Sequence, residues 1–116
     1  MDAIEIMVLD YLLNADLSVG DHIYLETPER QEEEYVLIEK TGSDERNHIR
    51  QAMIAVQSIS KTSLLRAIRI NEEVKAAMED LALLHSVFSC SLNSDHNFTN
   101  TQTKEYRYQA VFNIIY

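Results

Sequence analysis

The chain has 116 residues, of which 46% are hydrophobic and 25% charged, a balance that indicates one globular domain and excludes a disordered or low-complexity chain. Its formal net charge of −9 excludes tight binding of nucleic-acid backbones, which needs clustered Lys and Arg. Cys90 is the single cysteine, so no disulfide forms within the chain and we expect a reducing compartment, while no apolar run approaches the ~20 residues that span a bilayer.

The acidic residues are concentrated in the first part of the sequence. Residues 1–45 hold 13 acidic and 2 basic residues, a net charge of 2 − 13 = −11, whereas residues 46–116 hold 8 basic and 6 acidic residues, or +2. Two interpretations stay open at this point. The acids are either an ordinary solubilising surface or an acidic face that keeps a polyanion from adhering.

Residues 2–14 predict a first helix, with Asp2 as N-cap and Glu5 as its capping-box partner. The apolar residues of this helix form two stripes: Ile4, Val8, Tyr11 and Leu12 on one side, and Ile6, Leu9 and Leu13 on another. A surface helix of a monomer needs one such stripe. The second stripe must therefore meet either the domain's own sheet or another subunit, and its three residues are a candidate subunit interface.

Three strands are predicted next, over residues 22–26, 35–41 and 48–59. Residues 27–34 contain Pro28 and several charges, which is typical of an exposed hairpin loop. The Thr-Gly-Ser-Asp sequence that begins at Thr41 predicts the turn between the second and third strands.

A second helix of about 20 residues is predicted after Ser60, with N-cap candidates among Ser60, Thr62 and Ser63. Its expected core stripe is Leu64, Ile68, Ile70, Val74, Ala77, Met78 and Leu81.

Two strands complete the predicted fold. In the first, over residues 84–93, we expect Leu84, Phe88, Cys90 and Leu92 to face the core. The polar residues 94–104 that follow predict either a long hairpin loop or a pair of frayed strand ends. In the last, the apolar face consists of Tyr106, Tyr108, Ala110, Phe112, Ile114 and Tyr116. The order α-β-β-β-α-β-β predicts a single α+β domain over residues 1–116, with an antiparallel sheet of about five strands and one long and one shorter helix packed on one side.

The sequence contains no recognisable catalytic arrangement. His85, Cys90 and His96 lack the spacing of metal ligands, and Cys90 lies on the predicted buried face, where a thiol is inert. Gly20 and Gly42 are isolated, so no glycine-rich phosphate loop is present. We therefore predict no enzyme activity, no catalytic residues, no metal site and no cofactor.

The second half of the chain resembles a known family. A strand, IRQAMIAVQSIS, runs into a Ser-capped helix with Gln57 and Ser60 at the junction, and a Tyr106-Arg107-Tyr108 sequence lies in the final strand. In this the chain resembles the tail-terminator proteins of long-tailed bacteriophages, also called tail-completion or head-tail joining proteins. The resemblance extends over nearly the whole chain.

The resemblance implies a non-enzymatic virion protein, assembled in the host cytoplasm, that caps the tail tube as a hexameric ring. It implies two partners, the tail tube protein and the head connector or completion protein, and DNA that passes through without specific binding; no membrane is involved. In such a ring the acidic excess is expected to line the lumen, at Glu29, Glu32, Glu33, Glu34, Asp44 and Glu45. Two alternatives remain open: another head-tail joining or neck protein, and a small dimeric α+β ligand-binding or regulatory domain.

Overall fold

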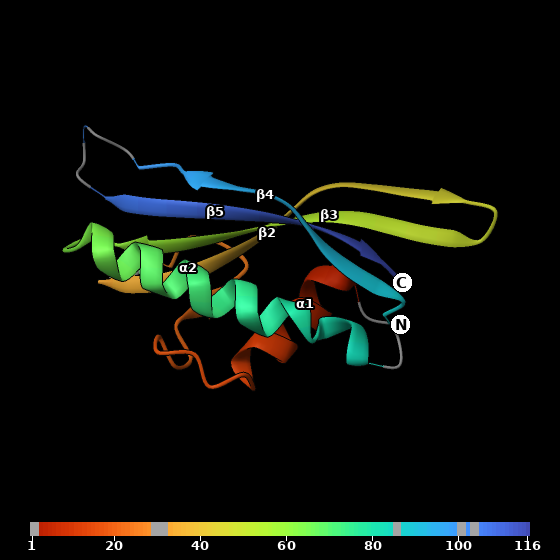
Figure 1. Ribbon diagram of the computed structural model, residues 1–116, viewed down its shortest axis with the longest axis horizontal. Coiled ribbons are helices and arrows are strands. Elements are labelled where there is room, and N and C mark those ends of the chain that lie inside the picture. Colours follow the sequence, from red (N-terminus) through yellow and green to blue (C-terminus); the bar gives the residue numbers. More distant parts are fainter. Residues whose placement is uncertain (1–2, 29–32, 85–86, 100–101, 103–104) are drawn as a thin grey trace.

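The computed structural model describes residues 3–28, 33–84, 87–99, 102 and 105–116. These residues form an α+β domain with two α-helices, one 3-10 helix and five strands, in the predicted order (Figure 1). The elements are α1 (Ile4–Leu13), β1 (Ile23–Tyr24), β2 (Glu34–Arg46), β3 (Ile49–Ser60), α2 (Leu64–Glu79), η1 (Leu81–Leu83), β4 (Ser89–Asn97) and β5 (Tyr106–Ile115).

The strands form one sheet in the order β1-β2-β3-β5-β4. The pairs β2–β3, β3–β5 and β4–β5 are antiparallel, as predicted. The short strand β1 is different, because it runs parallel to β2, with Ile23 opposite Val36. A hairpin joins antiparallel strands only, so the predicted hairpin loop over residues 27–34 is wrong. The sheet is mixed, with its one parallel pair at the β1 edge.

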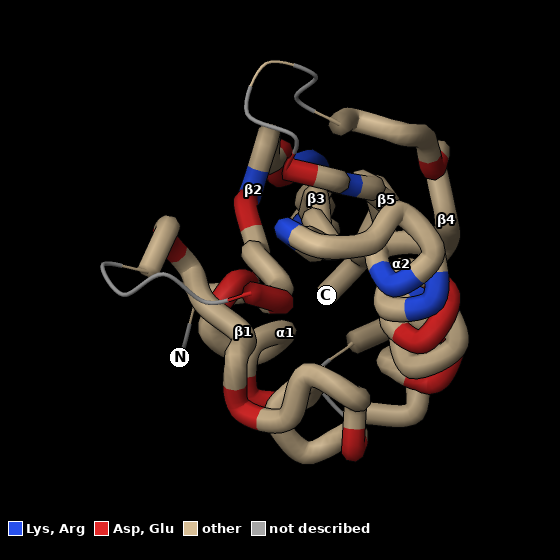
Figure 2. The backbone as a smooth tube through the Cα atoms, turned by 90° about the vertical axis from the view of Figure 1, so that its left-hand side faces the viewer, with Lys and Arg blue, Asp and Glu red and all other residues tan. Residues whose placement is uncertain are grey.

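Both helices lie on the same face of the sheet, as Figure 1 shows, and the core lies between the two layers. The centre of this core is formed by fully buried residues of every layer, among them Ile4, Val8, Leu12, Val36, Ile38, Ile54, Val56, Ile70, Val74, Met78 and Ile114. Seen along the sheet, β1 and β2 lie on the side of α1 and β4 on the side of α2 (Figure 2). The two lateral edges of the sheet are therefore chemically different surfaces.

The first helix buries the stripe predicted for it, with Ile4, Val8 and Leu12 in the core and Tyr11 half-buried. Its N-terminus differs from the prediction, because the N-cap is Ala3 and no side chain caps it. Asp2 lies outside the described residues, and Glu5 lies near Lys40 at 3.8 Å. The Tyr11 hydroxyl donates to the carbonyl oxygen of Ala77 at 2.5 Å, which joins α1 to the last turn of α2.

The second helix begins as predicted at Ser63, whose hydroxyl accepts the backbone N–H of Arg66 at 3.2 Å. Its buried stripe is Ala67, Ile70, Asn71, Val74 and Met78. Leu64 is exposed and Ile68 only half-buried, in contrast to the predicted stripe, because both lie to one side of this line of residues on the helix. The helix ends at Glu79, and Leu81 is buried in the 3-10 turn that follows.

The β2–β3 hairpin is longer than predicted and extends past the helices (Figure 1). The chain does not turn at Thr41; a β-bulge between Lys40 and Gly42 absorbs one extra residue, and pairing continues to Arg46 opposite Ile49. The turn lies at Asn47 and His48, both with positive φ, of 52° and 67°. Two adjacent residues with positive φ form the type I′ turn that suits the twist of a two-residue hairpin.

The terminal strand β5 confirms the predicted register. Ala110, Phe112 and Ile114 are buried on the helix-covered face, while Tyr106, Tyr108 and Tyr116 are half-buried. The neighbouring strand β4 begins at Ser89 rather than residue 84 and continues to Asn97, in agreement with the alternative that strand ends occupy part of the polar segment. Its outer edge has no neighbour among the described strands.

Candidate assembly surfaces

Within the described residues, no three His, Cys, Asp or Glu side chains are grouped so that they could hold a metal ion, and no helix has the length and apolar character needed to cross a membrane. Cys90 is half-buried beneath α2, and burial raises the pKa of its thiol to about 11. A thiol with that pKa is almost entirely protonated at neutral pH, and only the thiolate is nucleophilic. The thiol of Cys90 is therefore a poor nucleophile at neutral pH.

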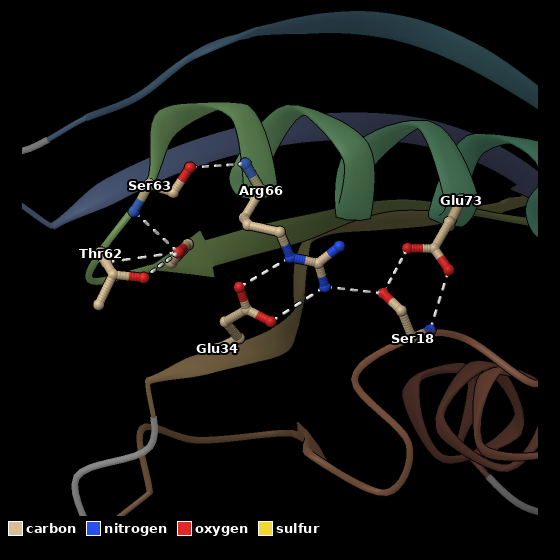
Figure 3. A network of polar contacts seen from close by, with 7 residues as sticks. Ser18, Glu34, Thr62, Ser63, Arg66 and Glu73 are labelled. Carbon is tan, nitrogen blue, oxygen red and sulfur yellow. Dashed lines mark hydrogen bonds and ion pairs between the residues drawn. The ribbon is translucent and has the colours of Figure 1, made fainter.

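The most connected polar site is a network around Arg66, at the start of α2 (Figure 3). The guanidinium of Arg66 donates to both carboxylate oxygens of Glu34 on β2, from Nε at 2.8 Å and from Nη2 at 3.0 Å. Its Nη2 also donates to the hydroxyl oxygen of Ser18 at 3.1 Å. Ser18 in turn donates its backbone N–H and its hydroxyl to the two carboxylate oxygens of Glu73. One arginine thus joins α2, β2 and the loop after α1.

This network changes the ionisation of its members. The hydrogen bonds from Arg66 hold the pKa of Glu34 below its ordinary value of 4.5, against the opposing effect of partial burial. The same pairing raises the pKa of Arg66. The bidentate geometry is the strongest form of an arginine–carboxylate contact. Glu34 is therefore a structural carboxylate, held in place and partly neutralised.

The structure separates the acids that the sequence analysis grouped together. Glu33 and Glu34 lie at the start of β2, whereas Asp44 and Glu45 lie near its far end, on the extended hairpin. Ten residues of strand separate Glu34 from Asp44, which is roughly 33 Å. Glu33, Asp44 and Glu45 are exposed, and Glu29 and Glu32 lie outside the described residues. Among the described acids of this set, Glu33 and Glu34 therefore lie near one end of β2, and Asp44 and Glu45 near the other.

The second apolar stripe of α1 lies largely on the surface. Ile6 and Leu13 are each 39% exposed, and Leu9 is half-buried against the domain's own core. Glu5 and Asp10 flank the stripe, so this surface is an apolar strip with acidic borders. Two of the three predicted interface residues are therefore free to contact another molecule.

A polar network also crosses the sheet face that carries no helix. Arg107 on β5 donates to the amide oxygen of Gln57 on β3 at 2.6 Å and pairs with Glu105. The Gln57 side-chain amide donates to Gln109, its cross-strand neighbour, at 3.1 Å. Gln57 and Arg107, each part of a sequence motif of the family resemblance, are thus brought together although 50 residues separate them.

The apolar side chains of β4 are not buried as predicted. Phe88, just before the strand, is 83% exposed and Leu92 is 49% exposed, while Cys90 is half-buried. A cavity of about 280 Å³ lies between α2 and β4, with Met78, Cys90, Leu92 and Phe112 in its wall. The ion pair of Lys75 with Asp95, at 2.5 Å, connects the two elements beside it. The alternating pattern of β4 therefore marked an apolar face correctly, but this face is only partly covered.

Sequence reasoning missed three of these features. The contact between Glu34 and Arg66 joins residues 32 positions apart, and no local pattern signals it. The long hairpin had a signal in Asn47, because Asn adopts positive φ more readily than most residues, but Thr-Gly-Ser-Asp gave the stronger turn pattern. The cavity beside β4 had no signal in the sequence, because the placement of the helices on the sheet decides which strands are covered.

Comparison with known proteins finds a solved structure with a similar fold. No protein-family model matches the sequence, and no curated protein matches it. Among solved structures, the chain is similar to one from the structure described as the virion of a native gene transfer agent (GTA) particle, with a TM-score of 0.72 and 18% sequence identity. The match covers 93% of this chain and 90% of that chain. At this identity the likeness shows the shared fold, over nearly the full length of both chains.

Proposed function

We propose that this chain is a non-enzymatic structural protein of a phage-like virion, and that it closes the end of the tail tube as a ring. The observation that supports this most strongly is the full-length fold match to a chain of the gene transfer agent virion. The resemblance in sequence to tail terminators supports the same class.

In this proposal six copies form the ring, and its two ends contact the tail tube protein and the head connector or completion protein. The exposed stripe of α1 contributes to the contact between copies. Because an apolar stripe with acidic borders is costly to leave in water, a contact that covers it is favourable. DNA passes through the opening without specific binding.

The acidic hairpin end supports a lumen that does not retain DNA. Asp44 and Glu45 are exposed on the part of β2 that extends beyond the helices, and like charge repels a duplex from such a surface. Arg46 lies 3.3 Å from Asp44, but both side chains are largely exposed and the pair is a weak one. Glu34 is less suited to this role because Arg66 already pairs with it.

The test of the ring uses the exposed pair Ile6 and Leu13. The purified chain, alone and mixed with tail tubes of the same virion, is examined by sedimentation and negative-stain electron microscopy. We expect rings that cap tube ends, and loss of these rings in Ile6→Lys/Leu13→Lys. The matched control is Leu64→Lys/Leu65→Lys, which changes two exposed leucines on α2 and should leave the rings intact.

The outcomes separate the proposal from its alternatives. A stable dimer that does not bind tail tubes would support the alternative of a ligand-binding or regulatory domain. Rings that bind connector but no tube would support another neck protein. For the lumen, Asp44→Lys/Glu45→Lys should leave rings intact and make them bind duplex DNA in a salt-sensitive way, while Asp21→Lys/Glu26→Lys, with the same change of charge, should not. Equal DNA binding by both variants would contradict an acidic lumen at the hairpin.

A further inference from the structure

The widths of helices and strands explain why β4 is poorly covered. Neighbouring strands lie about 4.8 Å apart and a helix with its side chains is about 10 Å wide, so one helix covers about two strands. In the described structure α1 contacts β1 and β2, and α2 contacts chiefly β3 and β5. The two α-helices therefore cover chiefly four strands of the five-stranded sheet, and the edge strand β4 is only partly covered, by α2 and by η1.

The partly covered strand β4 presents apolar side chains on the helix side of the sheet. Cys90 and Leu92 lie opposite Ile114 and Phe112 of β5, so their side chains continue the face that carries the core. The cavity of about 280 Å³ between Leu92 and Met78 is large enough for about two aliphatic side chains, since a cavity of ~150 Å³ holds one benzene ring. What is missing here is a third helix beside α2.

We propose that α1 of a neighbouring copy occupies this place, with its Ile6 and Leu13 side chains packed into the cavity between α2 and β4. This inference rests on the proposed ring and names the contact that builds it. Figure 2 shows α1 on the side of β1 and β2, and α2 on the side of β4. The cavity lies between α2 and β4. Each copy then contacts one neighbour through its α1 and the other neighbour through its cavity between α2 and β4. The helix layer thus continues from copy to copy.

The distribution of charge favours this head-to-tail contact over a symmetric dimer. The α1 edge belongs to residues 1–45, which carry 2 − 13 = −11, whereas residues 64–97, from α2 to β4, hold 3 basic and 5 acidic residues, or 3 − 5 = −2. A symmetric contact through α1 would place two strongly acidic edges together. The head-to-tail contact places the strongly acidic edge against a much less acidic one, so the repulsion between like charges is weaker than in the symmetric contact.

A contact between two different surfaces has a further consequence for assembly. An assembly built through such a contact can add further copies beyond two, and it closes into a ring when the rotation between neighbouring copies permits closure. A symmetric contact, by contrast, ends at a dimer.

Disulfide cross-linking tests this contact directly, because two cysteines form a disulfide only when their Cα atoms are within about 7 Å. In a Cys90→Ser background, Leu13→Cys is combined with Leu92→Cys, which places one cysteine on each proposed surface. The matched control combines Leu13→Cys with Ser91→Cys, because Ser91 lies on the opposite face of β4. Ile6→Cys with Leu92→Cys provides a second pair, and circular dichroism verifies that each variant is folded.

Under mild oxidation we expect the Leu13–Leu92 pair or the Ile6–Leu92 pair to give a ladder of dimers, trimers and larger species, which is lost in the Ser91 control. A product that stops at the dimer, or Leu13→Cys alone cross-linking to itself, would overturn the head-to-tail contact. Rings seen by electron microscopy without any ladder would overturn this contact and leave the proposed function standing. A chain that remains monomeric and caps no tubes would overturn both.

Discussion

Leu92 of β4 and Phe112 of β5 lie directly opposite each other on the same face of the sheet, yet they have different environments. Phe112 is 3% exposed, whereas Leu92 is 49% exposed. Both occur in strands with alternating apolar residues, and both point to the side of the helices. The difference is that α2 lies over β5 and only touches β4.

This pair shows what a strand pattern can establish. Alternation indicates which face of a strand is apolar, but the burial of that face depends on a layer packed above it. In the interior strands this layer is the protein's own helix. At β4 it is incomplete, and the structure leaves a cavity there. The interior strands therefore carry the buried core, whereas the apolar face of the edge strand stays partly exposed.

The largest expected effect comes from truncating the covered member of this pair. Phe112→Ala should lower the free energy of unfolding by about 3–5 kcal/mol, because it removes a buried aromatic ring from a packed core. Leu92→Ala is the matched control and should cost about 1 kcal/mol, since half of its side chain is already in water. Denaturant titration of the monomer measures both. Equal losses would show that β4 is covered as well as β5.

Much of the fold follows from local patterns. The buried stripe of α1, the Ser63 cap of α2 and the burial of Ala110, Phe112 and Ile114 on β5 are set by periodicity and capping, and all are confirmed. These features depend on residues within a few positions of one another. The same is true of the number and order of the elements.

Most of the features that sequence reasoning missed are non-local, whereas the turn at Asn47 and His48 and the Ala3 N-cap of α1 are local. The parallel pairing of β1, with Ile23 opposite Val36, depends on the path of the chain between the strands. The pairing of Glu34 with Arg66 depends on how α2 lies against β2. The exposure of Leu92 depends on helix width relative to sheet width. The periodicity of one segment does not contain these relations between segments. The apolar faces of the candidate assembly surfaces were therefore predictable from the sequence, but the extent to which other elements cover them was not.

The second expected effect concerns the network around Arg66, which joins α2 to β2 and to the loop after α1. Arg66→Ala should destabilise the monomer by about 1–2 kcal/mol, because it removes a bidentate charge-assisted contact that is partly exposed to solvent. Arg69→Ala is the control: Arg69 is exposed on the same helix and has no ion pair among the described residues, so its loss should have little effect. A double-mutant cycle with Glu34→Ala isolates the pair. A coupling energy near zero would contradict its structural role.

A smaller effect should appear in the pH dependence of stability. The pKa of Glu34 is lowered in the folded chain, so the native state binds fewer protons than the unfolded state near and below pH 4.5. Its contribution is therefore complete above that pH and is lost as pH falls through the folded-state pKa. Glu34→Gln should therefore reduce the fall in the free energy of unfolding as the pH is lowered below about 4.5. Asp21→Asn, at a carboxylate outside the network, should leave this fall unchanged, and an equal reduction by both would refute this assignment.

The smallest effect is expected at the end of the hairpin, far from the helices. His48 has a φ of 67°, in the left-handed region where a residue with a Cβ is strained and glycine is not. His48→Gly should therefore stabilise the hairpin by up to about 0.5–1 kcal/mol, whereas Gln51→Gly, in the regular part of β3, should destabilise by a similar amount. Hydrogen exchange of the β2–β3 amides measures this locally. Because no helix packs on this hairpin end, the gain should be confined to these amides and leave those of β5 unchanged; faster exchange in both variants would show that the turn is not of type I′.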